Sequence, residues 1–314
     1  MDPRFSFFSV DVEISNNCDL DCRMCARSRI VRPRGWMARS TFANIVRTLL
    51  PLKSRITLCG MGNPVSHPLW SEFVQDYKTA GGKIGLVIHG THLTGQITED
   101  LCRVEPHFVE ISFPSANKEH FGTLCPKSHY ETARDAVIHL AKAADQRFPV
   151  VVIGLQTGIN PQEENVSKQH WQSFGLRTRV FPCHSRGGSL TDPALLTSPI
   201  QNQPVSGCGL IGMHSFVTWQ GKHLACCHDL AGQTEFGDLN CDTLEILLER
   251  KAKYLNQYNP FPICAACDDP YRLAPRPSGP FPESDRARQK VLRRLSKMSA
   301  FSSGNRPAAP KKGS

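Results

Sequence analysis

Three cysteines stand close together near the start of the chain, in the stretch NNCDLDCRMCARS. Cys18, Cys22 and Cys25 follow the spacing C-x3-C-x2-C and come directly after an apolar run. A [4Fe–4S] cluster normally takes four cysteine thiolates, so three close thiolates leave one iron open to a small molecule. A zinc site is the alternative. Zinc favours C-x2-C pairs with a fourth ligand nearby, and the next histidines along the chain are His67 and His89.

Strand-like and helix-like patterns alternate over the first 190 residues and would position this loop. The apolar runs that predict strands lie at 7–14, 55–58, 83–90, 107–114, 148–156 and 176–183. Helical patterns between them lie at 40–50, 69–80 and 130–144. Such alternation predicts a parallel sheet with helical crossovers, and six units are too few for a closed eight-strand barrel. We therefore expect an α/β fold, a partial (β/α)6 TIM-like barrel, with the cysteine loop at the mouth where such folds assemble active sites.

The pattern changes from about residue 206. SFVTWQGKHLACC predicts a hairpin with its turn at Gln220-Gly221, and residues 242–257 predict an amphipathic helix that precedes CAACDDP. We expect a small cysteine-rich module of one β-hairpin and one helix. Past residue 270 the chain is rich in Pro, Ser and Arg, a composition that cannot build a core, and we expect a largely disordered tail.

The 314-residue chain has a formal net charge of +9, and 40% of its residues are hydrophobic, enough for a sizeable core. Eleven Lys and Arg residues but only two acidic ones lie from Tyr271 onward, so the excess charge belongs to the tail and disfavours nucleic acid as a partner. No apolar run approaches the ~20 residues that span a membrane, and the acidic start suits no signal peptide. We expect a cytoplasmic protein, in which thirteen cysteines indicate metal or redox chemistry rather than disulfides.

Taken together, these features resemble the radical S-adenosylmethionine (SAM) enzymes, whose hallmark is C-x3-C-x2-C after the first strand of a six-unit α/β barrel. The resemblance covers roughly residues 5–270 and is specific at Cys18, Cys22 and Cys25. It implies that the open iron of a [4Fe–4S] cluster binds the amino and carboxylate groups of SAM. One electron would then split SAM, and the resulting 5′-deoxyadenosyl radical would take a hydrogen atom from a substrate C–H bond. A flavodoxin- or ferredoxin-type donor would supply the electron.

Further motifs resemble the SAM-binding surface of that family. Gly60, Gly62 and Asn63 lie in GMGNP, which is similar to the GGEP stretch whose backbone contacts the amino group of SAM. Ser112, at the end of the fourth predicted strand, matches the ribose-contacting position, and Gly154 lies in IGL, which resembles the adenine-contacting segment. The resemblance thus implies that these five residues bind the cofactor.

A second cysteine set has the spacing C-x17-C-x37-C-x2-C and consists of Cys208, Cys226, Cys264 and Cys267. It resembles the twitch module, a shortened SPASM domain, which implies an auxiliary [4Fe–4S] cluster and two clusters in all. A structural zinc site with the same thiolates is the alternative. Cys227 and Cys241 lie close by and are candidate hydrogen-atom donors, although most free cysteines are simply packed. The expected domains are a radical SAM partial barrel, an auxiliary-cluster module and a tail, at 1–200, 201–270 and 271–314.

The chain's size and its single four-cysteine module resemble the small enzymes that act on aminoglycosides and aminocyclitols. The resemblance implies a small polar substrate and either dehydrogenation, in which the substrate radical loses an electron and a proton, or epimerisation, in which a thiol returns a hydrogen atom. A peptide-modifying maturase is the alternative, but the first predicted strand begins within about ten residues of Met1 and leaves no place for a leader-binding domain. A non-enzymatic iron–sulfur or zinc-binding protein is the alternative of another class, which would gain nothing from an open iron.

Other polar side chains stand at predicted strand ends, where barrel enzymes place substrate ligands. They are Glu13, Asn16, Glu110, Gln156, His184 and Arg186. A basic run beside the cysteine loop is a candidate contact for an anionic substrate or an acidic electron donor and comprises Arg27, Arg29, Arg32 and Arg34. For both groups the alternative is an ordinary structural or solvated role.

Overall fold

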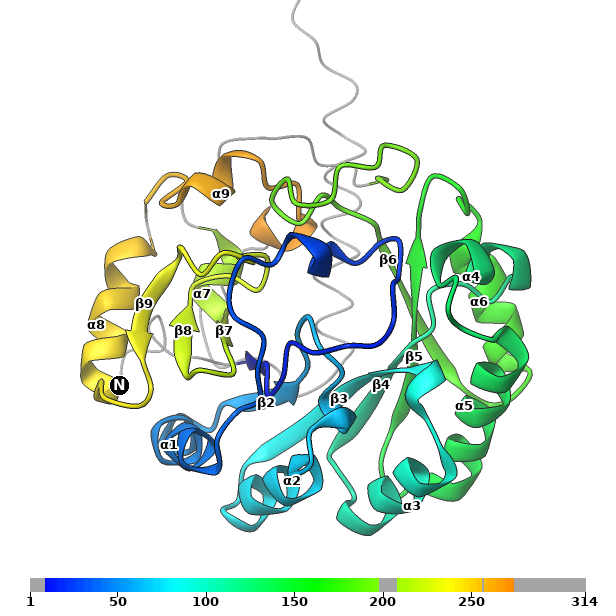
Figure 1. Ribbon diagram of the computed structural model, residues 1–314, viewed down its shortest axis with the longest axis horizontal. Helices are drawn as coiled ribbons and strands as arrows, with labels where there is room; N and C mark the ends of the chain where they lie inside the picture. Colours follow the sequence, from blue (N-terminus) through cyan, green and yellow to red (C-terminus); the bar gives the residue numbers. More distant parts are fainter. Residues whose placement is uncertain (1–8, 198–207, 256, 274–314) are drawn as a thin grey trace, which may run out of the picture.

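The structure, a computed structural model, describes residues 9–197, 208–255 and 257–273 (Figure 1). Within these residues nine strands form one sheet in the order β6-β5-β4-β3-β2-β1-β7-β8-β9. Strands β1 to β6 are β1 (Ser9–Val12), β2 (Arg55–Leu58), β3 (Lys83–His89), β4 (Phe108–Ser112), β5 (Val150–Gln156) and β6 (Arg177–Pro182). The remaining strands are β7 (His214–Val217), β8 (Lys222–Leu224) and β9 (Glu235–Asp238). The six predicted strands are thus confirmed as a parallel, open, barrel-like array, which is the predicted fold class.

Helices lie on the outer side of the curved sheet (Figure 1). The first six are α1 (Arg39–Leu49), α2 (Trp70–Thr79), α3 (Gly95–Val104), α4 (Lys118–Leu124), α5 (Tyr130–Ala144) and α6 (Glu163–Gln172). The C-terminal part adds α7 (Gly209–Met213), α8 (Leu244–Tyr254) and α9 (Pro262–Ala265). The predicted helices correspond to α1, α2, α5 and α8, whereas α3, α4 and α6 have no counterpart among the predictions. None of the helices in the described part of the chain has the length and apolar character needed to cross a membrane.

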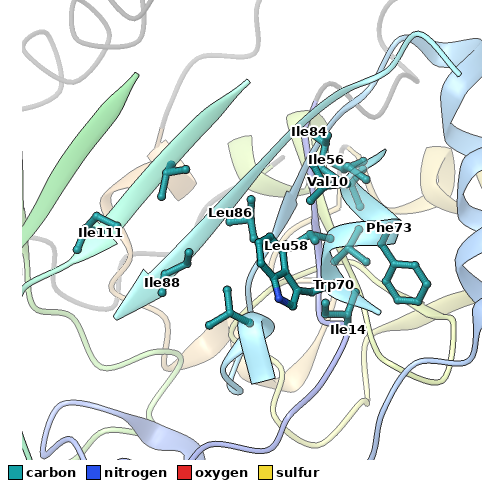
Figure 2. Packing of buried hydrophobic residues seen from close by; sticks show 14 of the residues in the cluster. Val10, Ile14, Ile56, Leu58, Trp70, Phe73, Ile84, Leu86, Ile88 and Ile111 are labelled. Atoms are coloured by element: carbon teal, nitrogen blue, oxygen red, sulfur yellow. The ribbon is translucent and has the colours of Figure 1, made fainter. Parts of the chain in front are cut away.

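The outward-facing residues of the strands are apolar and pack against the helices. Val10, Ile56 and Ile84 stand in register on β1, β2 and β3, and all three side chains are fully buried. Trp70 and Phe73 of α2 close over these strands (Figure 2). Every second strand residue therefore contributes to one apolar layer between sheet and helices, which holds the sheet in its curved shape.

The intervening residues point to the concave side of the sheet and are largely polar. His89, Ser112 and Arg179 lie on one level, because β3 to β6 are paired in register there. Glu110, one step lower on β4, accepts a hydrogen bond from Arg179 at 3.0 Å. A closed eight-strand barrel fills its interior with branched apolar residues, so charged and polar groups here are the chemistry of a binding surface.

The C-terminal strands extend the same sheet rather than forming a separate one. β7 pairs in parallel with β1, with Ser9 opposite His214, and β8 and β9 add antiparallel strands. The predicted hairpin is confirmed as β7 and β8. Phe236, Gly237 and Asp238 lie in β9, and Gly237 is needed there because a Cβ would lie 1.9 Å from Leu247 of α8. The predicted domain boundary at 200 lies outside the described residues, and so does the predicted tail at 271–314 from residue 274 onward; its first three residues, 271–273, belong to a short 3-10 helix.

Candidate functional site

The three-cysteine loop follows β1 and crosses the mouth of the curved sheet (Figure 1). On one side the Arg23 N–H donates to the carbonyl of Leu124, at the end of α4, over 2.8 Å. On the other side Trp219 Nε1, between β7 and β8, donates to the Pro33 carbonyl over 3.1 Å. The loop is therefore anchored to both halves of the sheet, which fixes the cysteines above the polar concave face.

The donors on this loop suit an iron–sulfur cluster. Cys18, Cys22 and Cys25 are partly exposed, and a turn closed by Cys25 N–H and the Cys22 carbonyl (2.9 Å) brings the last two together. Burial raises the pKa of Cys18, and the charges of Asp19 and Cys22 raise it further. Three soft thiolates in one loop match the cysteine ligation of a [4Fe–4S] cluster with one open iron.

Two further side chains meet this loop. Cys125 Sγ lies 3.5 Å from Cys22 Sγ and 3.4 Å from Nε2 of His89, the last residue of β3. The hydrogen bond from Cys125 lowers the pKa of Cys22 to about 5, against the opposing effect of burial. The same contact raises the pKa of Cys125. Only the fold reveals this group, because Cys22 and Cys125 are 103 residues apart in sequence.

The segment after β2 lies against the start of the cysteine loop. Asn63 N–H donates to the Asn17 carbonyl over 2.8 Å, and an added Cβ at Gly62 would stand 2.1 Å from the Ser15 carbonyl oxygen. Gly60 has φ of +132°, a conformation that L side chains rarely adopt. The Asn63 side chain caps the short 3-10 helix that follows. Glycines thus let this backbone approach the start of the loop closely, and the predicted contacts of Gly60, Gly62 and Asn63 with the cofactor stay predictions.

The other two predicted cofactor residues lie on different faces of the sheet. Ser112 is on the concave face at the end of β4. Gly154 turns its Cα outward to α6, where an added Cβ would lie 3.3 Å from Ser167 Oγ. Its neighbours Ile153 and Leu155 occupy the concave side of β5. A contact between Gly154 and the cofactor would therefore use its backbone, and the predicted roles of Ser112 and Gly154 stay predictions.

The second cysteine set is brought together by the fold. One cavity in the C-terminal module is lined by Cys208, Cys226, Cys264 and Cys267. Cys208 begins α7, Cys226 follows β8, and Cys264 lies in α9. Burial raises the pKa of Cys208, Cys264 and Cys267, the last to about 12. A metal centre would have to displace these protons, and four thiols that line one cavity suit either a [4Fe–4S] cluster or zinc.

Cys227 lies between two histidine–aspartate pairs. On one side His214 Nε2 is 3.3 Å from Asp11 Oδ2, and these atoms and Cys227 Sγ lie within 4.8 Å of one another. On the other side His228 Nε2 is 2.6 Å from Asp269 Oδ2, and its Nδ1 is 3.9 Å from Cys227 Sγ. Burial opposes a charge on His214, but Asp11 raises the pKa of His214 to about 10. The hydrogen bond with Cys226 lowers the pKa of Cys227 well below its ordinary value, against burial, and His228 and His214 lower it further, so an imidazole on either side can pass a proton to the Cys227 thiolate.

The remaining candidates are placed less suggestively. Cys241 is exposed in the turn after β9, on the side of the C-terminal module away from β1. Arg29 and Arg34 are exposed, in keeping with a solvated loop. His184 Nδ1 accepts from the backbone N–H of Arg186 at 3.2 Å.

Two predicted substrate candidates have structural partners instead. Glu13 and Arg32 form a buried ion pair, with 2.8 Å between Oε1 and Nη1. Glu13 Oε2 also accepts from the Met61 N–H at 3.2 Å, and Arg32 Nε donates to the Leu230 carbonyl at 3.3 Å. The pair thus connects β1, the segment after β2 and the C-terminal module behind the cysteine loop. Asn16 is likewise fully buried and bonded within the loop, to Pro33.

Solved structures share the overall fold. BtrN in complex with AdoMet and 2-DOIA has a TM-score of 0.61 and 16% identity, covering 88% of this chain and 97% of that chain. SuiB from Streptococcus suis, bound to the precursor peptide SuiA, has a TM-score of 0.64 and 12% identity over 77% of this chain and 64% of that one. The protein anSMEcpe with bound AdoMet has a TM-score of 0.60 and 12% identity over 93% and 95%. At these identities the likeness shows the fold alone.

Sequence comparison gives the family. A tungsten-containing aldehyde ferredoxin oxidoreductase cofactor-modifying protein from Pyrococcus furiosus is 28% identical over 103 residues, which is 32% of this chain and 29% of that protein. The match thus spans less than a third of the curated relative. Residues 12–168, half of the chain, match the Radical SAM superfamily, whose members are enzymes that use a [4Fe–4S] cluster and SAM. With this match, and with three thiols on the loop after β1, the chain belongs to the radical SAM superfamily.

Proposed function

We propose that this enzyme acts on a C–H bond of a small polar substrate, such as an aminoglycoside, aminocyclitol or sugar, and that Cys227 returns a hydrogen atom to the substrate radical, which gives epimerisation. The observation that carries the proposal is the position of Cys227, between the His214–Asp11 and His228–Asp269 pairs. Asp11 places one of these pairs on the inner side of β1, so the thiol adjoins the polar concave face.

The loop and its surroundings would hold the family's cofactors. Cys18, Cys22 and Cys25 are the proposed cluster ligands, and the segment Gly60–Asn63 is the proposed SAM cradle. When bound, the cluster supplies the electron that splits SAM into methionine and the radical that removes the substrate hydrogen. The anchored loop keeps these groups above the concave face, where Glu110 and Arg179 offer charged partners for hydroxyl and amino groups.

Hydrogen return from Cys227 balances in atoms and electrons. An adjacent imidazolium, His214 or His228, first gives its proton to the Cys227 thiolate. The S–H bond of Cys227 then breaks, a new C–H bond forms on the opposite face of the substrate carbon, and a sulfur-centred radical remains. One electron from a flavodoxin- or ferredoxin-type reductant and one proton restore the thiol. His214, with Asp11 beside it, is positioned to hold that proton.

Dehydrogenation is the second candidate, and the four-cysteine cavity favours it. In that reaction the substrate radical loses one proton and one electron, and an auxiliary [4Fe–4S] cluster would supply an acceptor for the electron. Reconstituted protein should then contain about eight irons per chain. About four irons together with one zinc would instead make the second site a structural zinc site.

Turnover in D2O separates the two reactions, with aminocyclitols and aminoglycosides as the substrates tested. Because thiol hydrogens exchange with solvent, epimerisation places one deuterium on a product carbon, and Cys227→Ala should abolish this label. Cys241→Ala, at an exposed site, is the matched control and should keep it. A product lighter by two hydrogens, formed equally well by Cys227→Ala, would replace epimerisation by dehydrogenation.

Reductive cleavage of SAM tests the cluster ligands without any substrate. The reconstituted, dithionite-reduced enzyme should form 5′-deoxyadenosine, and a variant with Cys18, Cys22 and Cys25 all changed to Ala should form none. Cys102→Ala, which alters a partly buried cysteine in α3, should behave as the parent enzyme. Cleavage of SAM by the triple variant would refute the assignment of these ligands.

A further inference from the structure

Cys125 is packed against the cysteine loop although it belongs to neither ligand set. It directly follows α4, it is 1% exposed, and its Sγ contacts Cys22 Sγ at 3.5 Å and His89 Nε2 at 3.4 Å. The adjacent backbone fixes this approach, because Arg23 N–H donates to the carbonyl of Leu124 over 2.8 Å. Residues next to both cysteines are thus hydrogen-bonded to each other, and the contact between the sulfurs is built into the fold.

The hydrogen bonds of this group have one consistent direction. The backbone N–H of Thr91 can only donate, and it points to His89 Nδ1 at 3.2 Å, so a neutral His89 carries its hydrogen on Nε2. That Nε2–H donates to Cys125 Sγ. The single hydrogen of the Cys125 thiol is then directed to Cys22, whose sulfur can only accept once it is a thiolate.

We infer that Cys125 donates an S–H···S hydrogen bond to Cys22 in its role as a ligand of the SAM-binding cluster, and that His89 orients the donor. The inference rests on the ligand role of Cys22 given under the proposed function. Reduction adds negative charge that spreads over the cluster and its thiolates, so a hydrogen bond to one thiolate stabilises the reduced state more than the oxidised state. Cys125 is therefore a positioning residue that makes the cluster easier to reduce.

The test is a redox titration of the reconstituted enzyme, followed by electron paramagnetic resonance. The signal whose g-values change on addition of SAM belongs to the cluster with the open iron, which distinguishes it from any second cluster. At the potential where half of this signal is reduced in the parent enzyme, Cys125→Ala should lower the reduced-to-oxidised ratio about five-fold, for the loss of one hydrogen bond. Cys125→Ser keeps a donor and should lie between the two.

A second variant and a control keep the test decisive. His89→Leu retains the Cys125 thiol but removes the group that orients it, together with the direct contact of His89 with Cys22, so the ratio should fall in the same direction. Cys102→Ala removes a partly buried cysteine from α3 and should leave the ratio unchanged. If Cys125→Ala loads too little iron to be titrated, Cys125→Ser and His89→Leu decide the result.

Two results would overturn the inference. The first is a fully loaded Cys125→Ala variant with the ratio of the parent enzyme. The second is a ratio that differs between Cys125→Ala and the parent enzyme only in the absence of SAM. Such a result would make Cys125 a fourth cluster ligand that SAM displaces. Cys22→Ala separates this failure from that of the proposed function. If Cys22→Ala loses the SAM-sensitive signal, Cys22 is a ligand even if Cys125 has no effect. If Cys22→Ala retains that signal, neither the ligand role of Cys22 nor the role of Cys125 stands.

Discussion

Replacement of Glu13 by Gln tests whether the buried ion pair behind the cysteine loop holds the mouth of the sheet together. The side chains of Glu13 and Arg32 are 0% and 7% exposed, and two contacts of 2.8 and 3.3 Å join them. The variant leaves a buried guanidinium without its counter-charge, a change that typically costs about 3–5 kcal/mol. A Gln oxygen can still accept one hydrogen bond from Arg32. We therefore expect the unfolding free energy to fall by about 3 kcal/mol, the lower end of that range.

Urea unfolding of the reduced, cluster-free protein, followed by circular dichroism, measures this loss. Asp192→Asn is the matched control, because the Arg23–Asp192 pair has the same 2.8 Å length but side chains 43% and 30% exposed, and it should cost less than about 1 kcal/mol. Combining Glu13→Gln with Arg32→Met removes the buried charge and should recover part of the loss. A Glu13→Gln cost no greater than that of Asp192→Asn would refute this account of the ion pair.

Two further predictions concern the SAM cradle and the pH dependence of stability. Gly62→Ala would place a Cβ 2.1 Å from the Ser15 carbonyl oxygen, so the segment must move. Equilibrium dialysis should then show that the affinity for SAM is about ten-fold lower or more, which corresponds to about 1.4 kcal/mol. Gly95→Ala is the control, because a Cβ there meets nothing within 4 Å, and it should bind SAM normally. Despite the opposing effect of burial, Asp11 raises the pKa of His214 to about 10, so the stability gained from this pair is complete below about pH 6.5, the ordinary histidine pKa, and is lost as the pH rises through 10. The difference in unfolding free energy between the parent protein and Asp11→Asn should therefore shrink from pH 6.5 to 10, and a difference that is constant or grows would contradict this assignment.

The strands could be predicted because burial on one face leaves a local signature. The buried residues Val10, Val12 and Ile56 lie in stretches that either alternate apolar with polar residues or are apolar throughout. Each of these stretches has the length of a strand. α6 escaped prediction because its sequence, EENVSKQHWQ, is mostly polar and Trp171 is its only fully buried large side chain. The pairing of β1 with β7 has no local signature, since strands joined in parallel can lie anywhere along the chain.

The candidate site likewise contains some residues that the sequence could predict and others that only the fold brings together. The proposed ligand cysteines carry a spacing that a single loop or module must satisfy, so their sequence predicts that they gather, and four of them line one cavity. Cys125 and His89 come from different elements and meet only through the packing of α4 against the loop. Asp11 and His214 likewise meet because β1 and β7 are neighbours, which no spacing in the sequence encodes.

The pairing of β1 with β7 has a consequence for the newly made chain. Ser9 and His214 are 205 residues apart, so one side of β1 keeps unpaired backbone groups until most of the polypeptide has left the ribosome. A fragment that stops before β7 would expose this edge permanently and would tend to associate through it. Attempts to express the N-terminal barrel alone should therefore give aggregates, whereas fragments that retain β7, β8 and β9 keep the edge covered as in the full chain and should remain dispersed.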